Sequence, residues 1–289
     1  MSAGLRTPSG RPTGRGTEAA RAAGPAFSPR RVGGLVLRQL YLLRGSWPRA
    51  LELVYWPTVQ IVLWGFITLF LATTSSYVAQ VPGVLLSAVL LWDVLFRTQL
   101  GTSILFMEEM WSRNLGHLFV SPLRPYEMAC ALVVMSLIRT LIGVGGAALV
   151  AIPLFHYSVF SLGPPLLLFF ATLAVMGWGM GLLISGLVLR FGVGAETLAW
   201  GAIFVLQPIS GVYYPLATLP EPLQWLARAV PSSYVFEGMR ALLFTGHLRA
   251  DLLLAGAALD LVYLAAGIAG FLYAFKVARV RGLLVHVGE

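Results

Sequence analysis

The sequence predicts an all-α protein that crosses a membrane several times. Of the 289 residues, 58% are hydrophobic and 11% are charged, whereas a soluble domain carries about 25% charged residues. The apolar residues form runs of roughly 20, the length of helix that crosses about 30 Å of hydrocarbon. Glycine and proline, with 31 and 17 residues, are spread through these runs, as is tolerated where spanning helices pack together.

Six apolar runs are long enough to span the membrane. Each is apolar on all faces, unlike the one-sided stripe of a helix on the surface of a soluble protein. The expected bounds are 51–72, 84–106, 127–155, 164–189, 195–214 and 252–276. The predicted fold is therefore a polytopic bundle of six transmembrane helices.

The basic residues predict the orientation of this bundle. Nine arginines lie within the first fifty residues, and Lys276, Arg279 and Arg281 lie at or beyond the end of the last run. The connections 73–83 and 157–163 carry no charged residue. Because positive charge stays on the cytoplasmic side, we expect a multi-pass protein of the cell inner (plasma) membrane with both termini in the cytoplasm.

Three segments at the ends of the chain lie outside the six runs. Residues 1–28 are rich in Gly, Pro, Ala and Arg, so we expect a disordered basic tail; a transit peptide or a misassigned start has the same composition. Residues 29–50 alternate arginine with leucine, valine and tyrosine, which predicts an elbow helix lying in the headgroup layer. Residues 282–289 are expected to form a short cytoplasmic tail.

The connection between the second and third runs is charged, amphipathic and longer than a turn requires. It extends from Glu108 to Pro125 and ends on a Pro-x-x-Pro stop. We expect a short helix along the cytoplasmic membrane face, with its charges turned to water and its apolar residues turned to the membrane body. The residues expected to form this docking surface are Glu108, Glu109, Arg113, Leu115, Leu118, Phe119 and Arg124.

Ionisable side chains within a span are expensive and are candidates for function. Asp93 and Arg97 are one helical turn apart in the second run, so they can pair on one face. Arg139 lies near the middle of the third run, at a depth similar to that of Asp93, and Asp260 lies in the outer half of the last run. We interpret these charges as structural ion pairs first, with a proton relay or a substrate contact as the alternative. The small number of carboxylates within the spans argues against transport that is coupled to an ion gradient.

The connection between the fifth and sixth runs contains two short apolar pieces. Pro222 begins the first, Leu223, Leu226 and Val230 give it an apolar face, and Pro231 stops it; the second covers 233–243. Both are too short to span and too apolar for a free loop. We therefore expect a re-entrant hairpin at the outer surface, packed against protein. A simple interfacial helix is the alternative.

Several kinds of chemistry are missing from the sequence. The four histidines are scattered and Cys130 is the only cysteine, so neither a metal site nor a disulfide framework is expected. Lys276 is the only lysine and follows no glycine-rich turn, which excludes a phosphate-binding loop. The net charge of +8 sits in the tail and at span ends, so nucleic acid is not an expected partner. We expect no catalytic residues and no cofactor bound by this chain.

Three features together point to a known family. They are the six-span layout with a charged connection that ends in LFVSPLRP at 118–125, the block ISGVYYPL at 209–216, and the motifs PSSY and EGMRAL at 231–234 and 237–242. Over about 30–281 the chain resembles the type-2 ABC transporter permeases, the membrane subunits of ABC exporters. That family often has an acidic-Arg-Gly-Thr-Leu-Glu sequence where this chain reads WSRNLG, a departure that bears on subfamily and substrate.

The resemblance implies partners and a mechanism. Two permeases pair, as a homodimer or a heterodimer, and each is served by a separate ABC ATPase subunit that binds ATP and Mg²⁺ and pushes on the coupling helix at 108–125. The outer hairpin would act as an external gate, formed by Tyr213, Tyr214, Pro215, Leu223, Trp225 and Leu226. The expected function is export of a lipophilic or lipid-linked compound, drug-like or a secondary metabolite. Export of a polysaccharide or lipid-linked glycan is the alternative; an ion-coupled carrier or a membrane enzyme lies outside the class.

Overall fold

The computed structural model describes residues 27–76, 78, 81, 83–112, 114–115 and 121–281, and over these residues the secondary structure is helical. Nine α-helices lie in this part of the chain: α2 (Pro29–Arg44), α3 (Trp47–Thr74), α5 (Gly83–Trp111), α7 (Pro125–Phe155), α8 (Pro165–Phe191), α9 (Glu196–Ile209), α10 (Glu221–Arg228), α11 (Pro231–Thr245) and α12 (Ala250–Val280). Three short 3₁₀ helices connect them: η1 (Val159–Leu162), η2 (Val193–Ala195) and η3 (Leu216–Thr218).

Among the described residues, five helices are long and apolar enough to cross a membrane: α3, α5, α7, α8 and α12. They correspond to the first four and the last of the runs seen in the sequence. The expected fifth span is shorter than predicted, since α9 has 14 residues and so a length of roughly 21 Å. It ends one residue after Pro208, and Gly211 then adopts a left-handed backbone with φ of 59°.

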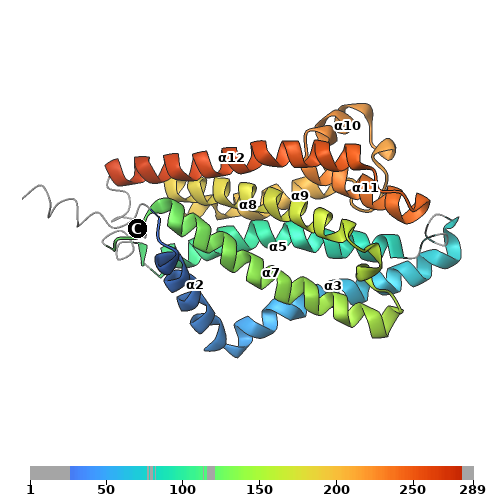
Figure 1. Cartoon of the computed structure of the whole chain (residues 1–289), viewed down its shortest axis with the longest axis horizontal. Helices are drawn as coiled ribbons and strands as arrows, with labels where there is room; N and C mark the ends of the chain where they lie inside the picture. Colours follow the sequence, from blue (N-terminus) through green and yellow to red (C-terminus); the bar gives the residue numbers. More distant parts are fainter. Residues whose placement is uncertain are drawn as a thin grey trace, which may run out of the picture.

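The helices pack as one bundle around α5, which is buried along nearly its whole length (Figure 1). Glycines allow its neighbours to approach closely. A Cβ atom added to Gly181 of α8 would lie 2.7 Å from Thr102 of α5, and one added to Gly179 would lie 2.7 Å from the Tyr263 backbone of α12. Gly177, four residues before Gly181, also lies against α5, because a Cβ atom there would overlap Thr98. This GxxxG spacing therefore serves close helix packing.

The elbow helix α2 leaves the bundle at an angle and meets the start of α3 at a sharp corner (Figure 1). It ends at Arg44, earlier than the expected boundary at residue 50, because Gly45 caps it with an N–H bonded to the Tyr41 carbonyl. Pro48 then lies in the first turn of α3, a position that suits proline.

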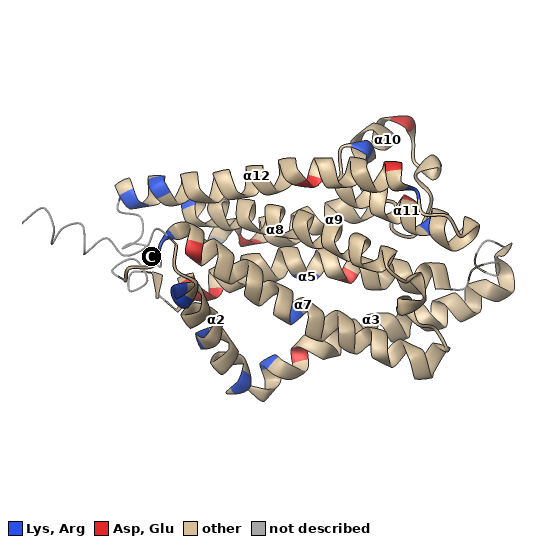
Figure 2. Ribbon diagram, viewed as in Figure 1, with Lys and Arg blue, Asp and Glu red and all other residues tan. Residues whose placement is uncertain are grey.

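Most charged residues lie towards the two ends of the bundle, and only a few charged positions lie along the middle of the long helices (Figure 2). We call the end that carries α2 the elbow end, and the end that carries α10 the hairpin end. This distribution is the one required of helices whose middle lies in hydrocarbon.

Candidate coupling site

At the elbow end, two glutamates bracket the segment that leads from α5 to α7. Glu109 lies in the last turn of α5, and Glu127 lies in the first turn of α7. Both carboxylates are buried, with exposed fractions of 2% and 0%. A buried carboxylate needs hydrogen-bond donors around it, and in both cases α2 supplies them.

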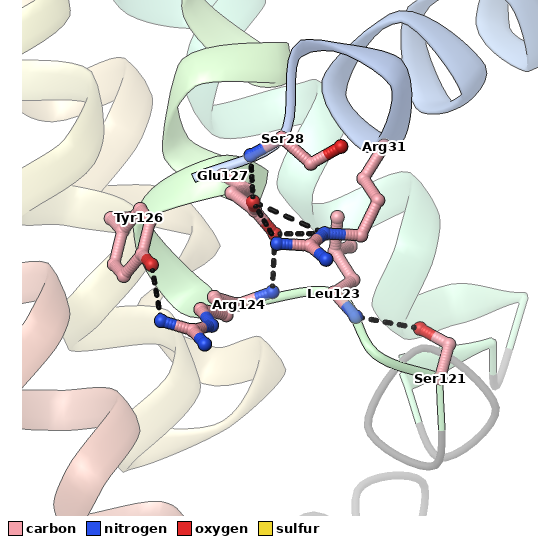
Figure 3. Close-up of polar contacts among 7 residues, drawn as sticks. All are labelled: Ser28, Arg31, Ser121, Leu123, Arg124, Tyr126 and Glu127. Carbon is pink, nitrogen blue, oxygen red and sulfur yellow. Dashed lines mark hydrogen bonds and ion pairs between the residues drawn. The ribbon is translucent and has the colours of Figure 1, made fainter. Parts of the chain in front are cut away.

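Glu127 joins the start of α2 to the start of α7 (Figure 3). Arg31 donates from Nη2 to Oε1 at 2.6 Å and from Nε to Oε2 at 2.9 Å. The backbone N–H of Ser28 donates to Oε1 at 2.7 Å, and that of Arg124 donates to Oε2 at 2.9 Å. The last bond is half of a capping box, since a glutamate at the third helical position satisfies the N-cap amide. The side-chain hydrogen bonds to Glu127 raise the pKa of the Arg31 guanidinium above its ordinary value.

Glu109 makes a second connection, seven residues further along α2. Its Oε1 accepts hydrogen bonds from Arg38 and from Gln39, the latter at 2.6 Å. Its Oε2 accepts from the side chain of Asn114 at 2.7 Å, so a residue of the connecting segment itself is held. Arg31 and Arg38 are two helical turns apart and therefore lie on one face of α2.

We call these two groups the Glu127 clamp and the Glu109 clamp. Together they tie α2 to both ends of the segment at 112–124, and charge-assisted hydrogen bonds of this kind are among the strong ones. A displacement of either end of the segment therefore has to move α2 or break one of the clamps.

Within the bundle, the second predicted group of charges is partly paired. Arg97 donates to Asp93 at 2.6 Å, as their spacing predicted. Of the two partners considered for Asp93, Arg139 is not the one used; Arg139 instead pairs with Glu108 at 3.6 Å. Asp260 is 4% exposed, and its Oδ1 has no hydrogen-bond partner among the described residues.

The family model of the ABC-2 type transporter matches residues 39–244, most of the chain. The chain belongs to the ABC-2 type transporter family. No curated protein matches the sequence closely enough to count as a relative. The chain is thus the permease subunit of an ABC transporter, a component that associates with an ABC ATPase.

The structure places the predicted docking residues of the permease in different environments. Leu115 is buried in the core. Glu109 was expected to present its charge to water, and this is wrong, because α2 covers it. The side chain of Glu108 is 25% exposed beside Arg139. Arg124 donates to the Tyr126 hydroxyl at 2.9 Å. Arg113, Leu118 and Phe119 lie outside the described residues.

Sequence reasoning missed the residues that build the clamps: Ser28, Arg31, Arg38, Gln39 and Glu127. Two signals were available. An acid in the first turn after a proline is a helix-start signal, and it describes Glu127. The spacing of seven between Arg31 and Arg38 marks one helical face, although nothing in the sequence says that this face meets glutamates.

At the hairpin end, the predicted gate residues fall into two groups. Tyr213 stacks on Trp64 of α3 with ring centroids 4.2 Å apart, and its hydroxyl accepts from Gln207 at 3.0 Å. Tyr214 donates to the Pro208 carbonyl at 2.7 Å. Pro215 is the N-cap of η3. These bonds fix the turn that ends α9.

The other group lies on α10 and faces away from the bundle. Leu223, Trp225 and Leu226 are 37%, 64% and 54% exposed. The residues that hold α10 onto the permease are instead Ala227, which is fully buried, and Val230, which is 6% exposed. α11 is packed deeper: Phe236 is fully buried and lies 6.4 Å from Trp92 of α5 between ring centroids.

Proposed function

We propose that this permease exports a lipophilic or lipid-linked compound, powered by ATP hydrolysis on a separate ATPase subunit that docks on the segment at 112–124. The observation that carries the proposal is the pair of clamps around that segment. A connection that needed only to turn the chain would not require two buried glutamates bonded to a third helix. An energy-transmitting contact does require such rigid attachment.

The orientation proposed from the arginines makes the elbow end cytoplasmic, with both termini on that side of the plasma membrane. Five long helices alone would leave the ends on opposite sides. We therefore propose that α9 and the turn at 210–215 complete a sixth crossing. The stacked pair of Trp64 and Tyr213 supports this, because it ties the end of α9 to α3.

Two permease copies are proposed to form the transporter, as a homodimer or a heterodimer. A large apolar face of α3 supports this, since Tyr55, Trp56, Phe66 and Phe70 are all more than half exposed. When the ATPases close on ATP and Mg²⁺, the clamped segment would move, and α2 with it. The hairpin with α10 would then open as the outer gate.

Docking can be tested by copurification from the cells that make the protein. The tagged permease is extracted in mild detergent, and bound proteins are identified by mass spectrometry. A partner with a Gly-x-x-x-x-Gly-Lys-Ser/Thr loop is expected. Trp111, half exposed at the end of α5, should contact it. Trp111→Ala should lower the amount of bound ATPase, whereas Trp47→Ala, exposed at the elbow corner, should not. Equal recovery in both variants would contradict docking at this segment.

Export of a polysaccharide or lipid-linked glycan is the second candidate, and one arrangement favours it. Asp93, which is 14% exposed and pairs with Arg97, lies near Tyr213, whose ring stacks on Trp64. Polar groups beside aromatic faces suit sugar rings, which have both hydroxyl groups and apolar C–H faces. Comparing cells with and without the gene, by untargeted analysis of retained lipophilic compounds and of surface glycans, separates the two candidates.

A further inference from the structure

A cavity of about 330 Å³ lies at the hairpin end, where η3, α11 and the start of α12 meet. Its lining residues are Pro215, Glu237, Arg240, Ala241, Phe244, Arg249 and Leu252. Two guanidinium groups and one carboxylate thus line it, and the remaining lining residues are apolar. Neither clamp contributes to it, and of the gate residues only Pro215 does.

Arg240 is a fixed, buried part of this cavity. It is 5% exposed, and its Nη1 donates to the Gly211 carbonyl at 2.8 Å. Its Nη2 donates to Glu237 Oε1 at 3.0 Å, and the same oxygen accepts from the Leu216 backbone N–H at 2.8 Å. The Nε atom has no hydrogen-bond partner among the described residues. Arg240 therefore contributes an immobilised cation to the wall of the cavity.

Arg249 supplies a second and more available cation. It pairs with Asp251 at 2.5 Å, and the two side chains are 56% and 59% exposed. Exposed pairs of this kind contribute little stability, so Arg249 can exchange Asp251 for another anion. Asp251 does not line the cavity, whereas Arg249 does. Arg249 is therefore the cation that is available to a ligand in the cavity, because Arg240 is already bonded to Glu237.

The apolar walls and the position of the cavity narrow the choice of anion. Ala241 and Phe244 of α11 and Leu252 of α12 line it, and they give it an apolar surface suited to methylene groups. On the same end, Arg228 lies over the exposed Trp225 ring at 4.7 Å, and exposed tryptophans mark the interface between membrane and water. We propose that the cavity binds the headgroup phosphate of an anionic phospholipid, with Arg249 as the phosphate ligand and Phe244 and Leu252 against its first chain carbons. This site requires only that the permease lies in a membrane, and it is independent of the transported substrate.

The test is lipid retention by the purified full-length permease. Delipidated protein in dodecyl maltoside is titrated with dioleoyl-phosphatidylglycerol or dioleoyl-phosphatidylcholine, and bound lipid is counted by native mass spectrometry. Phosphatidylglycerol should bind in preference to phosphatidylcholine. Arg249→Gln should weaken its binding about tenfold, the loss expected for one charge-assisted hydrogen bond. The matched control Arg228→Gln removes an exposed arginine at the same end, outside the cavity, and should bind normally.

A second variant tests the cavity itself without changing charge. Ala241→Phe fills it from α11 and should lower phosphatidylglycerol binding while Arg249 is intact. Equal retention of the two lipids, or equal losses in Arg249→Gln and Arg228→Gln, would overturn the proposal. Displacement of the lipid by inorganic phosphate at matched concentration would overturn it in favour of a site for a free anion. These measurements involve neither the ATPase nor transport, so their outcome does not depend on the proposed function.

Discussion

Arg31 of α2 and Glu127 of α7 lie 96 residues apart in the sequence and are joined by side-chain hydrogen bonds of 2.6 to 3.1 Å. The same carboxylate also accepts a hydrogen bond from the Arg124 N–H. Its two oxygens therefore hold both α2 and the last residue of the segment at 112–124. The position of the elbow helix is therefore linked to that of the segment proposed to receive the ATPase. Anything that pulls on α2 would therefore act on the same segment.

The first prediction concerns the Glu127 clamp. Glu127→Gln keeps the shape of the side chain and removes the charge that Arg31 needs. It should lower the melting temperature of the purified permease by several degrees, because it leaves the partly buried Arg31 guanidinium without its charge partner. Glu221→Gln, at the start of exposed α10, is the control. Thermal unfolding followed by tryptophan fluorescence measures both, and equal melting temperatures would contradict the structural importance of the clamp.

The second prediction tests whether both clamps hold α2. Leu35 lies on the buried side of α2 and is 8% exposed. In a Cys130→Ala background, Leu35→Cys should resist a water-soluble maleimide. Adding Glu109→Gln or Glu127→Gln alone should speed labelling modestly, because one clamp remains, and adding both should speed it far more. Fast labelling before either glutamate is changed would mean that α2 is not held as described.

The long helices were predictable from sequence, because an apolar run near 20 residues has few alternatives to a spanning helix. The shortness of α9 was not, since composition continues apolar through Tyr213 and only Pro208 and the left-handed Gly211 end the helix. The burial of Glu109 could not be predicted from the sequence either. Its partner Gln39 is 70 residues away, and an acid at a helix end is ordinarily exposed. Local sequence predicts elements well and long-range polar partners poorly.

The third prediction concerns the Asp93–Arg97 pair. Asp93→Asn leaves Arg97 unpaired within the bundle, where a central charge costs about 2.5–3.5 kcal/mol on insertion scales. Yield and melting temperature should both fall. Gly143→Ala should act in the same direction, because its Cβ would lie 2.7 Å from the Leu53 carbonyl oxygen and 3.0 Å from Arg97 Nη1. An Asp93→Asn variant of full stability that cannot transport would instead favour a substrate contact.

The fourth prediction concerns the contact between α8 and α12. Gly179→Ala should destabilise the permease, since the added Cβ would lie 2.7 Å from the Tyr263 carbonyl group, and backbone cannot move aside cheaply. Gly145→Ala is the matched control, because nothing lies within 4 Å of a Cβ there and alanine favours a helix over glycine. Its melting temperature should be unchanged or higher. Equal losses in the two variants would argue against close packing of α8 on α12.

The fifth prediction concerns the proposed outer gate. Cysteines are placed one at a time at Leu223, Trp225, Leu226 and Ala227 in a Cys130→Ala background. In the resting permease the first three should react with a water-soluble maleimide and Ala227→Cys should not, because only Ala227 is buried against the bundle. If α10 moves during transport, trapping ATP on the partner ATPase should change the labelling rates of the cysteines at 223, 225 and 226. Faster labelling of Ala227→Cys in that state would show that α10 moves away from the bundle. Rates that ignore the nucleotide at all four positions would leave α10 as a static surface helix, and the outer gate would have to lie elsewhere.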